Sequence, residues 1–207
     1  MHYGIRPHFI SKRAVLRHIL HSIYNCPQVI CGAKLIRIHM ETHHITLEDL
    51  KKIFPEAKFI VLYRKSLLDQ FVSLKIAEIA NAWQWTARFR LPDPIHLDLK
   101  EFERFCKTTR VFYEEMLQRD WLKDRAIVIS YEELVSAPQE LFDGRIFPFL
   151  GLQPSSVSAQ TRKQNIKSLH EIVQNYQEIE RFVHDPLTNQ GYQIKSGLPG
   201  RSSARFK

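Results

Sequence analysis

The most regular hydrophobic pattern in the chain is the run AKFIVLY at residues 57–63. Its nearly continuous apolar character is typical of a strand that is buried on both faces in a parallel sheet. A second short run, RAIVIS at 125–130, predicts another buried strand that leads into the acidic turn YEEL. The segment QVICGAKLIRI, residues 28–38, is rich in β-branched and apolar residues and predicts a third strand.

Helical periodicity fills most of the remaining chain. Apolar side chains recur at three- and four-residue intervals in three long segments, residues 12–24, 96–122 and 166–183. A shorter helix is predicted in ITLEDLKKIF, because Thr46 and Asp49 form an N-terminal capping pattern and Pro55 follows its end. Strands that alternate with helices predict an α/β fold. We expect one domain over residues 1–185 and a flexible tail, rich in Gly, Pro, Ser and basic residues, over 186–207.

Composition and charge limit the classes of partner that the protein could bind, but they do not identify one. The chain has 207 residues and a net charge of +8, which favours an anionic partner such as a nucleotide, a phosphorylated or sulfated small molecule, nucleic acid or an acidic membrane surface. Three cysteines without CxxC spacing indicate neither a disulfide framework nor a zinc site, so a reducing cytoplasm is the expected location. No apolar run reaches membrane-spanning length, and the first twenty residues do not resemble a signal peptide, so we expect no integral membrane contact.

The first candidate site lies where the predicted strand at 57–63 ends, at Arg64. Ligands of open parallel sheets bind beyond the carboxyl ends of the strands, close to the N-termini of the following helices. If Ser66 caps the next helix, then Ser66, Gln70 and Ser73 share one polar stripe that converges with Arg64 on a single anion. The alternative is structural: Arg64 pairs with Asp69, and Ser73 only packs against a neighbouring helix.

Three segments in order, FPEAKFIVLYRKSLLDQFVSLKIAE, AIVISYEELVSAPQELFDGRIFPFLGL and TRKQNIKSLHEIVQNY, resemble the sulfotransferase family, particularly its bacterial nodulation and trehalose-sulfating members. The resemblance implies a P-loop-nucleotide-hydrolase-like parallel sheet and 3′-phosphoadenylyl sulfate (PAPS) as donor, with no metal. It further implies that Arg64 and Ser73 hold the 3′-phosphate of the donor and that Gln70 supports them. Lys163, in TRKQN, would lie near the same donor site, although a solvated helix start explains it equally well. By the same resemblance, YEEL and FPFLGL are structural.

Catalytic candidates come from CGAKLIRIHME, where RIH is similar to the pattern that supplies the base in cytosolic sulfotransferases. His39 is the candidate base, because its unperturbed pKa lies near neutrality. Arg37 or Lys34 would stabilise charge on the sulfuryl group. Alternation along a strand places Arg37 and His39 on one face and Lys34 on the other. A metal site that combines His39 with the histidines at 43 and 44 lacks the carboxylate or cysteine pattern of a specific site.

One family feature is missing from the sequence. A strand followed by a Gly/Ser/Thr-rich turn and a helix, which cradles the 5′-phosphosulfate in the family, does not occur before residue 26. The domain is therefore expected to be N-terminally incomplete through truncation, to have lost catalysis, or to receive this loop from another chain. Trp83 and Trp85 could line an acceptor pocket, and ordinary packing explains them equally well.

The sequence predicts a sulfotransferase that moves a sulfuryl group from PAPS to a hydroxyl of a carbohydrate or lipid-linked acceptor. The second hypothesis is a catalytically inactive nucleotide-binding or interaction module of the same fold. A basic nucleic-acid-binding protein ranks third, because no recognised motif accompanies the basic segments. We therefore expect a small-molecule, glycan or lipid acceptor and no nucleic-acid partner, while the oligomeric state is not readable from the sequence.

Overall fold

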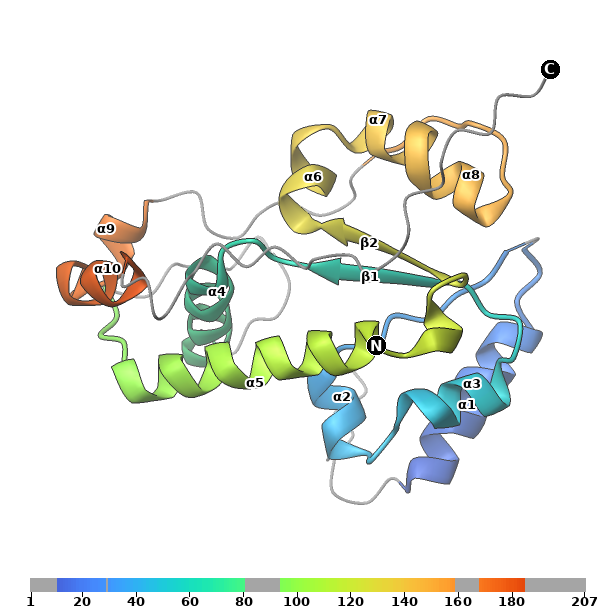
Figure 1. The fold of residues 1–207 in the computed structure, drawn as a ribbon, viewed down its shortest axis with the longest axis horizontal. Helices are drawn as coiled ribbons and strands as arrows, with labels where there is room; N and C mark the ends of the chain where they lie inside the picture. Colours follow the sequence, from blue (N-terminus) through green and yellow to red (C-terminus); the bar gives the residue numbers. More distant parts are fainter. Residues whose placement is uncertain (1–10, 29, 81–93, 159–167, 185–207) are drawn as a thin grey trace. The chain divides into compact units, whose positions relative to one another are not determined.

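A computed structural model of the protein describes residues 11–28, 30–80, 94–158 and 168–184, with side chains up to residue 180. The chain divides into two compact units, Met1–Ala57 and Lys58–Lys207, whose elements are drawn in Figure 1. None of the described helices is both long and apolar enough to cross a membrane. The predicted domain end at residue 185 and the predicted tail lie outside the described residues.

The first unit is helical, with α1 (Lys12–Tyr24), α2 (Arg37–Thr42) and α3 (Leu47–Ile53). The capping pattern predicted for α3 is confirmed, because the Thr46 hydroxyl accepts from the Asp49 backbone N–H and the Asp49 carboxylate accepts from the Thr46 backbone N–H. An ion pair of 2.5 Å between Lys12 Nζ and Asp49 Oδ2 connects α1 to α3. Among residues 11–28 and 30–57, the buried side chains are Leu16, Ile45 and Leu50.

The prediction of a third strand over residues 28–38 is wrong. Residues 31–36 have no regular structure, and the chain then turns into α2. A strand needs a neighbour to satisfy its outward N–H and C=O groups, and no strand is present in the described part of the first unit. The backbone is satisfied locally instead, with the His39 N–H donating to the Ile36 carbonyl at 2.9 Å. Ile36 and Ile38, on which the strand prediction rested, stay 38% and 56% exposed.

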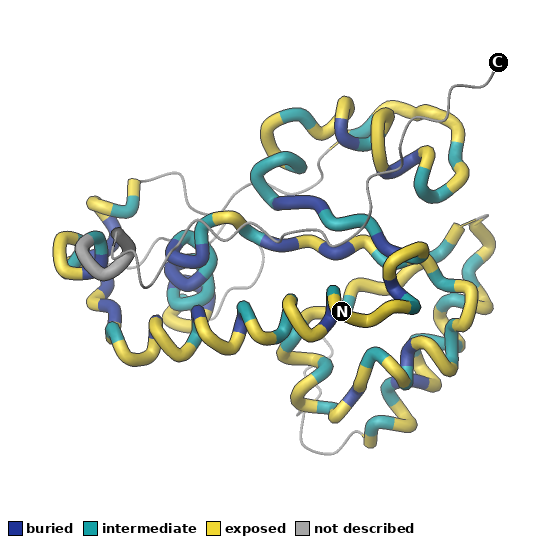
Figure 2. The backbone as a smooth tube through the Cα atoms, in the orientation of Figure 1, coloured by how far each residue is buried: buried dark blue, intermediate teal, exposed yellow. Residues whose placement is uncertain are grey.

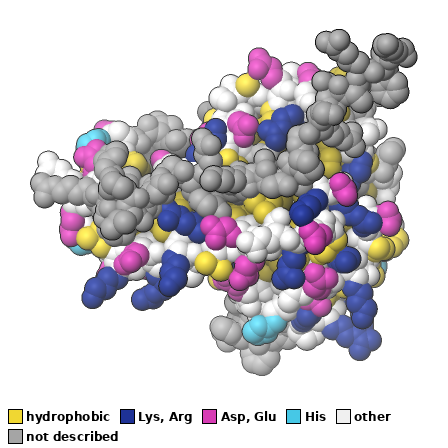
Figure 3. Space-filling view, viewed as in Figure 1, with side chains coloured by type: hydrophobic (Ala, Val, Ile, Leu, Met, Phe, Trp, Pro, Cys, Tyr) yellow, Lys and Arg dark blue, Asp and Glu magenta, His cyan; other side chains and the backbone are white. Residues whose placement is uncertain are grey.

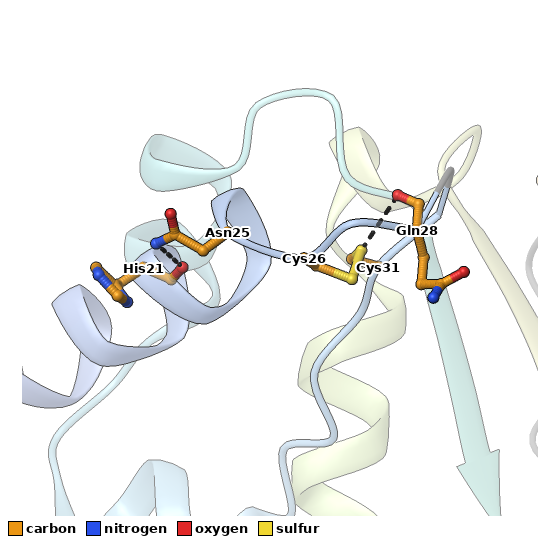
Figure 4. The surroundings of a disulfide bond; sticks show 5 residues. All are labelled: His21, Asn25, Cys26, Gln28 and Cys31. Carbon is orange, nitrogen blue, oxygen red and sulfur yellow. Dashed lines mark hydrogen bonds between the residues drawn. A yellow bond between two sulfur atoms is a disulfide. The ribbon is translucent and has the colours of Figure 1, made fainter.

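A disulfide joins Cys26 to Cys31, with their Cα atoms 6.3 Å apart (Figure 4). The prediction that no disulfide forms is therefore wrong. An odd number of cysteines is compatible with one bridge and one free thiol, and the free thiol is the buried Cys106 of the second unit. The bridge closes a short loop directly after α1, where the Asn25 side-chain amide donates to the His21 carbonyl at 2.8 Å. The loop that follows α1 is thus fixed covalently to the end of that helix.

The second unit contains the sheet. The strands β1 (Phe59–Tyr63) and β2 (Ala126–Ser130) pair in parallel, in register from Phe59↔Ala126 to Tyr63↔Ser130. Helices flank this small sheet, which confirms the predicted α/β class: α4 (Leu67–Ile79), α5 (Leu99–Leu117), α6 (Tyr131–Ser136), α7 (Pro138–Leu141), α8 (Phe147–Leu150), α9 (Leu169–Ile172) and α10 (Tyr176–His184). The 3-10 turn η2 (Asp120–Leu122) precedes β2, and a π-helical segment η3 (Phe142–Ile146) joins α7 to α8.

On each outer edge of the two-stranded sheet, one backbone carbonyl accepts a hydrogen bond from a side chain. The Phe59 N–H donates to the Arg125 carbonyl of the β2 side. Backbone groups alternate along a strand, so those of Val61 and Tyr63 also point toward β2 and those of Leu62 point away from it. The Leu62 carbonyl accepts from the Tyr113 hydroxyl at 3.0 Å. On the opposite edge, the Val128 carbonyl accepts from the guanidinium of Arg145. These two contacts satisfy edge carbonyls that would otherwise be open to a further strand.

The larger hydrophobic core lies between α4, α5 and the two C-terminal helices. Phe71 of α4 and Phe102 of α5 are 1% and 0% exposed, with ring centroids 5.2 Å apart. A smaller cluster of Ile129, Leu141 and Ile146 packs α7 and η3 on β2. Figure 2 shows buried positions along α4 and the strands, whereas α5 is exposed along one side. The smaller cluster therefore includes the sheet residue Ile129, and Arg64 follows the carboxyl end of β1.

Candidate anion-binding site at the carboxyl edge of the sheet

Arg64 follows β1 directly and is half-buried. Its Nη1 lies 3.4 Å from the Ser73 Oγ and donates to it. Its guanidinium carbon also lies 4.1 Å from the ring centroid of Tyr131, within the range of a cation–π contact. The guanidinium is thus held by α4 on one side and by the start of α6 on the other.

The register of the sheet explains why Tyr131 lies beside Arg64. Tyr63 and Ser130 are paired at the ends of two parallel strands, so the next residues, Arg64 and Tyr131, leave the sheet at the same level. Sequence reasoning assigned YEEL to a structural role and missed this contact. The pairing of the two predicted strands would have revealed it, because parallel strands bring their carboxyl ends to one edge.

The helix α4 begins as predicted. The Ser66 hydroxyl caps it by accepting from the Asp69 N–H at 3.1 Å. Ser73 and Gln70 lie on the stripe that starts at Ser66, and both are partly buried. The Gln70 Oε1 atom is buried without a hydrogen-bond partner in the described part of the chain. Arg64 and Asp69 are both described, and no ion pair joins them. The structural alternative, in which Arg64 pairs with Asp69, is therefore not supported by this contact.

Carboxylates next to this site are engaged by backbone groups. Glu132 Oε2 accepts from the Lys65 N–H at 3.1 Å. Glu133 Oε2 accepts from the hydroxyl and the N–H of Ser130, each at 2.7 Å, and these bonds lower the pKa of Glu133. Burial raises the pKa of Tyr63, and the two glutamates add to this shift. Glu133 therefore caps α6, which agrees with the structural role expected for this part of YEEL.

Arg64, Ser73 and Gln70 together offer what an anionic ligand with hydroxyl or amino groups requires. A guanidinium carries five N–H donors in a planar fork that matches phosphate oxygens. One of these donors engages Ser73, whose own hydroxyl proton remains available for a ligand oxygen. The buried Gln70 oxygen has no donor among the described residues, and a ligand that supplies one would satisfy it. Arg64 and Ser73 thus present donors of the kind that an anion requires, and Gln70 presents an acceptor on the same stripe of α4.

The catalytic candidates Lys34, Arg37 and His39 belong to the first unit. Lys34 is exposed in the irregular segment, and His39 is exposed on α2. Arg37 begins α2, and its Nε lies 3.5 Å from Glu41 Oε1. Two residues apart on a helix are separated by about 200° around its axis. The prediction that Arg37 and His39 share one face is therefore wrong, because it assumed a strand.

Other sequence candidates do not add to the site. Within the described residues, no group of three or more His, Cys, Asp or Glu side chains is arranged to hold a metal, and this covers the histidines of α2 and the turn after it. Lys163, Trp83 and Trp85 lie outside the described residues. Their predicted roles at the donor site and in an acceptor pocket stay predictions.

The fold and the site describe an α/β protein. Its second unit places an arginine, a serine and an amide close to the carboxyl edge of a parallel sheet. Residues 6–156, more than two thirds of the chain, match the model of the sulfotransferase family. The chain belongs to this family. No curated protein and no solved structure matches it. The family assignment agrees with the resemblance found in the sequence, and it makes the protein a transferase of the sulfuryl-transferring class.

Proposed function

We propose that the protein transfers a sulfuryl group from PAPS to a hydroxyl of a carbohydrate or lipid-linked acceptor, on a P-loop-nucleotide-hydrolase-like fold. The observation that carries this proposal is the contact of Arg64 with both Ser73 and Tyr131 at the carboxyl edge of the sheet. In this proposal Arg64 and Ser73 bind the 3′-phosphate of the donor. Gln70 supports the same ligand by accepting a hydrogen bond from it.

In sulfuryl transfer the acceptor oxygen attacks sulfur, the bond from sulfur to the phosphate oxygen breaks, and the nucleotide leaves with the bonding electrons. A base takes the acceptor proton, and cations stabilise the charge that develops on the sulfuryl and bridging oxygens. His39 remains our proposed base, with Arg37 or Lys34 as the electrostatic partner. These roles rest on the resemblance of RIH to the family pattern, because the argument from strand alternation no longer applies.

The donor site is tested by calorimetric titration of the full chain with adenosine 3′,5′-bisphosphate, with adenosine 5′-monophosphate as the comparison ligand. Loss of charge-assisted hydrogen bonds costs about 1.5–3 kcal/mol, so Arg64→Ala should weaken binding of the bisphosphate by roughly 10- to 150-fold. The monophosphate should bind weakly to both proteins. Arg104→Ala, at an exposed position of α5, is the matched control and should change neither affinity.

Two results would contradict the proposed donor site. Equal affinity of the wild-type protein for the bisphosphate and the monophosphate would show that the 3′-phosphate is not recognised. Equal losses in Arg64→Ala and Arg104→Ala would show that only net charge matters.

A noncatalytic nucleotide-binding module is the second candidate function, and one observation favours it. Arg64 and Ser73 are in contact in the described geometry, whereas Arg37 and His39 lie on opposite sides of α2. Such a module would bind adenosine 3′,5′-bisphosphate through Arg64 without transferring sulfate from PAPS to any acceptor. A radiolabelled-sulfate transfer assay on a panel of glycans and lipids separates the two functions.

The disulfide bears on location. Bridges between cysteines persist in oxidising compartments and are rare in the cytoplasm. We infer from the Cys26–Cys31 bridge that the protein folds in an oxidising compartment, in place of the cytoplasm that the cysteine count suggested. Rapid alkylation of the protein in its native cells, followed by mass spectrometry, should find Cys26 and Cys31 unmodified and bridged. Alkylation of both thiols would restore the cytoplasmic prediction.

A further inference from the structure

A groove of about 460 Å³ lies along α1 in the first unit. Its floor is apolar and is formed by Leu16 and Leu20 of α1 together with Ile53 at the end of α3. Its rim is basic and is formed by Lys12, Arg13 and Arg17. The volume falls within the range typical of small-molecule sites, about 300–1,000 Å³. The groove is built from the first unit alone and shares no residue with the proposed donor site.

The three cations of the rim are not equivalent. Lys12 is held by Asp49, and this contact helps to lower the Asp49 pKa to about 2. Arg13 and Arg17 are exposed, and within the described residues they form no ion pair or side-chain hydrogen bond. They are four residues apart on α1, so their side chains leave the same face of the helix one turn apart. Two guanidiniums are therefore available to one anionic group.

The surrounding helix adds to this positive field. No Asp or Glu occurs between residues 12 and 24, and the first turn of α1 has no acidic residue of its own. The N-terminal end of a helix carries roughly half a positive charge, and Arg13 and Arg17 lie in the first two turns. Figure 3 shows several Lys and Arg side chains in the region of α1 and α3, with Asp and Glu side chains among them, and α3 itself carries Glu48 and Asp49 in its first turn.

The apolar floor and the basic rim together indicate which class of ligand fits the groove. A simple anion would leave the apolar floor exposed, and a neutral lipid would leave both arginines without a partner. A polyanionic glycan has no hydrocarbon chain that could cover Leu16, Leu20 and Ile53, and a nucleic-acid duplex keeps the apolar faces of its bases stacked inside. We propose that this groove binds a single-chain anionic amphiphile, with its hydrocarbon chain on the apolar floor and its anionic head between Arg13 and Arg17. This ligand site goes beyond the proposed sulfuryl transfer and does not depend on it.

The test is a titration of the full chain with sodium decanoate below its micelle concentration. Decanoate should bind with one-to-one stoichiometry, and Arg13→Gln/Arg17→Gln should weaken binding at least tenfold. Both arginines are exposed, so this variant should keep the wild-type circular dichroism and melting temperature. The matched control is Arg104→Gln/Lys107→Gln, which removes two exposed positive charges from α5 and should bind decanoate normally.

Two further probes and a mapping experiment complete the design. Acetate carries the head without the chain, and 1-decanol carries the chain without the charge, so each should bind at least tenfold more weakly than decanoate. Hydrogen exchange should show protection of α1 and α3 by decanoate and no protection of α4. The proposal would be overturned by equal binding of decanoate to the Arg13→Gln/Arg17→Gln variant, by acetate binding as well as decanoate, or by adsorption to anionic vesicles without any binding of the monomer.

Discussion

Removal of the Cys26–Cys31 bridge should destabilise the first unit by an amount that follows from the length of the loop. The two cysteines are separated by five positions, so the bridge closes a very short loop. The chain-entropy relation for such a loop gives about 2 kcal/mol at 25 °C. Cys26→Ser/Cys31→Ser should therefore lower the free energy of local unfolding of α1 and its following loop by about 2 kcal/mol. This corresponds to a roughly 30-fold faster amide exchange where exchange reports the opening equilibrium.

Hydrogen exchange measured by mass spectrometry resolves the two units in one experiment on the full chain. Peptides from residues 11–57 should exchange faster in the double variant or after reduction, and peptides from α4 and α5 should not change. Burial raises the pKa of the Cys106 thiol to about 11, so this cysteine stays protonated and should not exchange with the bridge near neutral pH. Cys106→Ala serves as the control and should retain the full difference between oxidised and reduced protein. Unchanged exchange of the 11–57 peptides on reduction would refute the reasoning.

Two further predictions concern stability. The hydrogen bond from Lys12 and those from Thr46 lower the pKa of Asp49 from 3.8 to about 2, so its stabilising contribution is fully present above pH 4 and is lost as the pH falls toward 2. Acid titration monitored by hydrogen exchange in α3 should show this loss of stability. The Asp49→Asn variant should be less stable near neutral pH, and its stability should decline less on acidification. Equal declines in the variant and the wild-type protein would exclude a stabilising ion pair. Phe71→Ala should cost the second unit about 3–5 kcal/mol in urea unfolding, because this side chain is 1% exposed. Ile79→Ala on the same helix, where the side chain is 57% exposed, should cost less than about 0.5 kcal/mol, and similar costs for both would contradict the assigned core.

Local patterns in the sequence were sufficient for several elements. The runs predicted as strands, 57–63 and 125–130, contain β1 and β2, and the capping pattern at Thr46 and Asp49 begins α3. The expected burial of the first strand on both faces is wrong, because Ile60 and Leu62 are 42% and 41% exposed. Ser66 caps α4 as expected. Each of these features depends on residues within one or two turns, or on a run whose side chains are mostly apolar. Such features can be predicted without knowledge of distant contacts.

Features that depend on a partner elsewhere in the chain were predicted less well. The segment 28–38 has strand-like composition, but β-propensity has effect only where a neighbouring strand is available. The pairing of Cys26 with Cys31 depends on the path of the loop after α1, which the cysteine count does not reveal. The contact of Tyr131 with Arg64 depends on the register between β1 and β2. The missing information was tertiary for the strand and for the Tyr131 contact, and for the bridge it was the local path of the loop.

The double contact of Arg64 has a consequence for affinity that sequence spacing alone does not supply. Ordering an arginine side chain costs about 1.5–2 kcal/mol in rotamer freedom. Here the stacking on Tyr131 and the hydrogen bond to Ser73 restrict the guanidinium before any ligand is present. The fold therefore bears part of the ordering cost that binding would otherwise require, which strengthens association without any new contact. Arg64 is thus better suited to hold a fixed phosphate than an equally charged side chain that moves freely in solvent, such as Lys65 beside it.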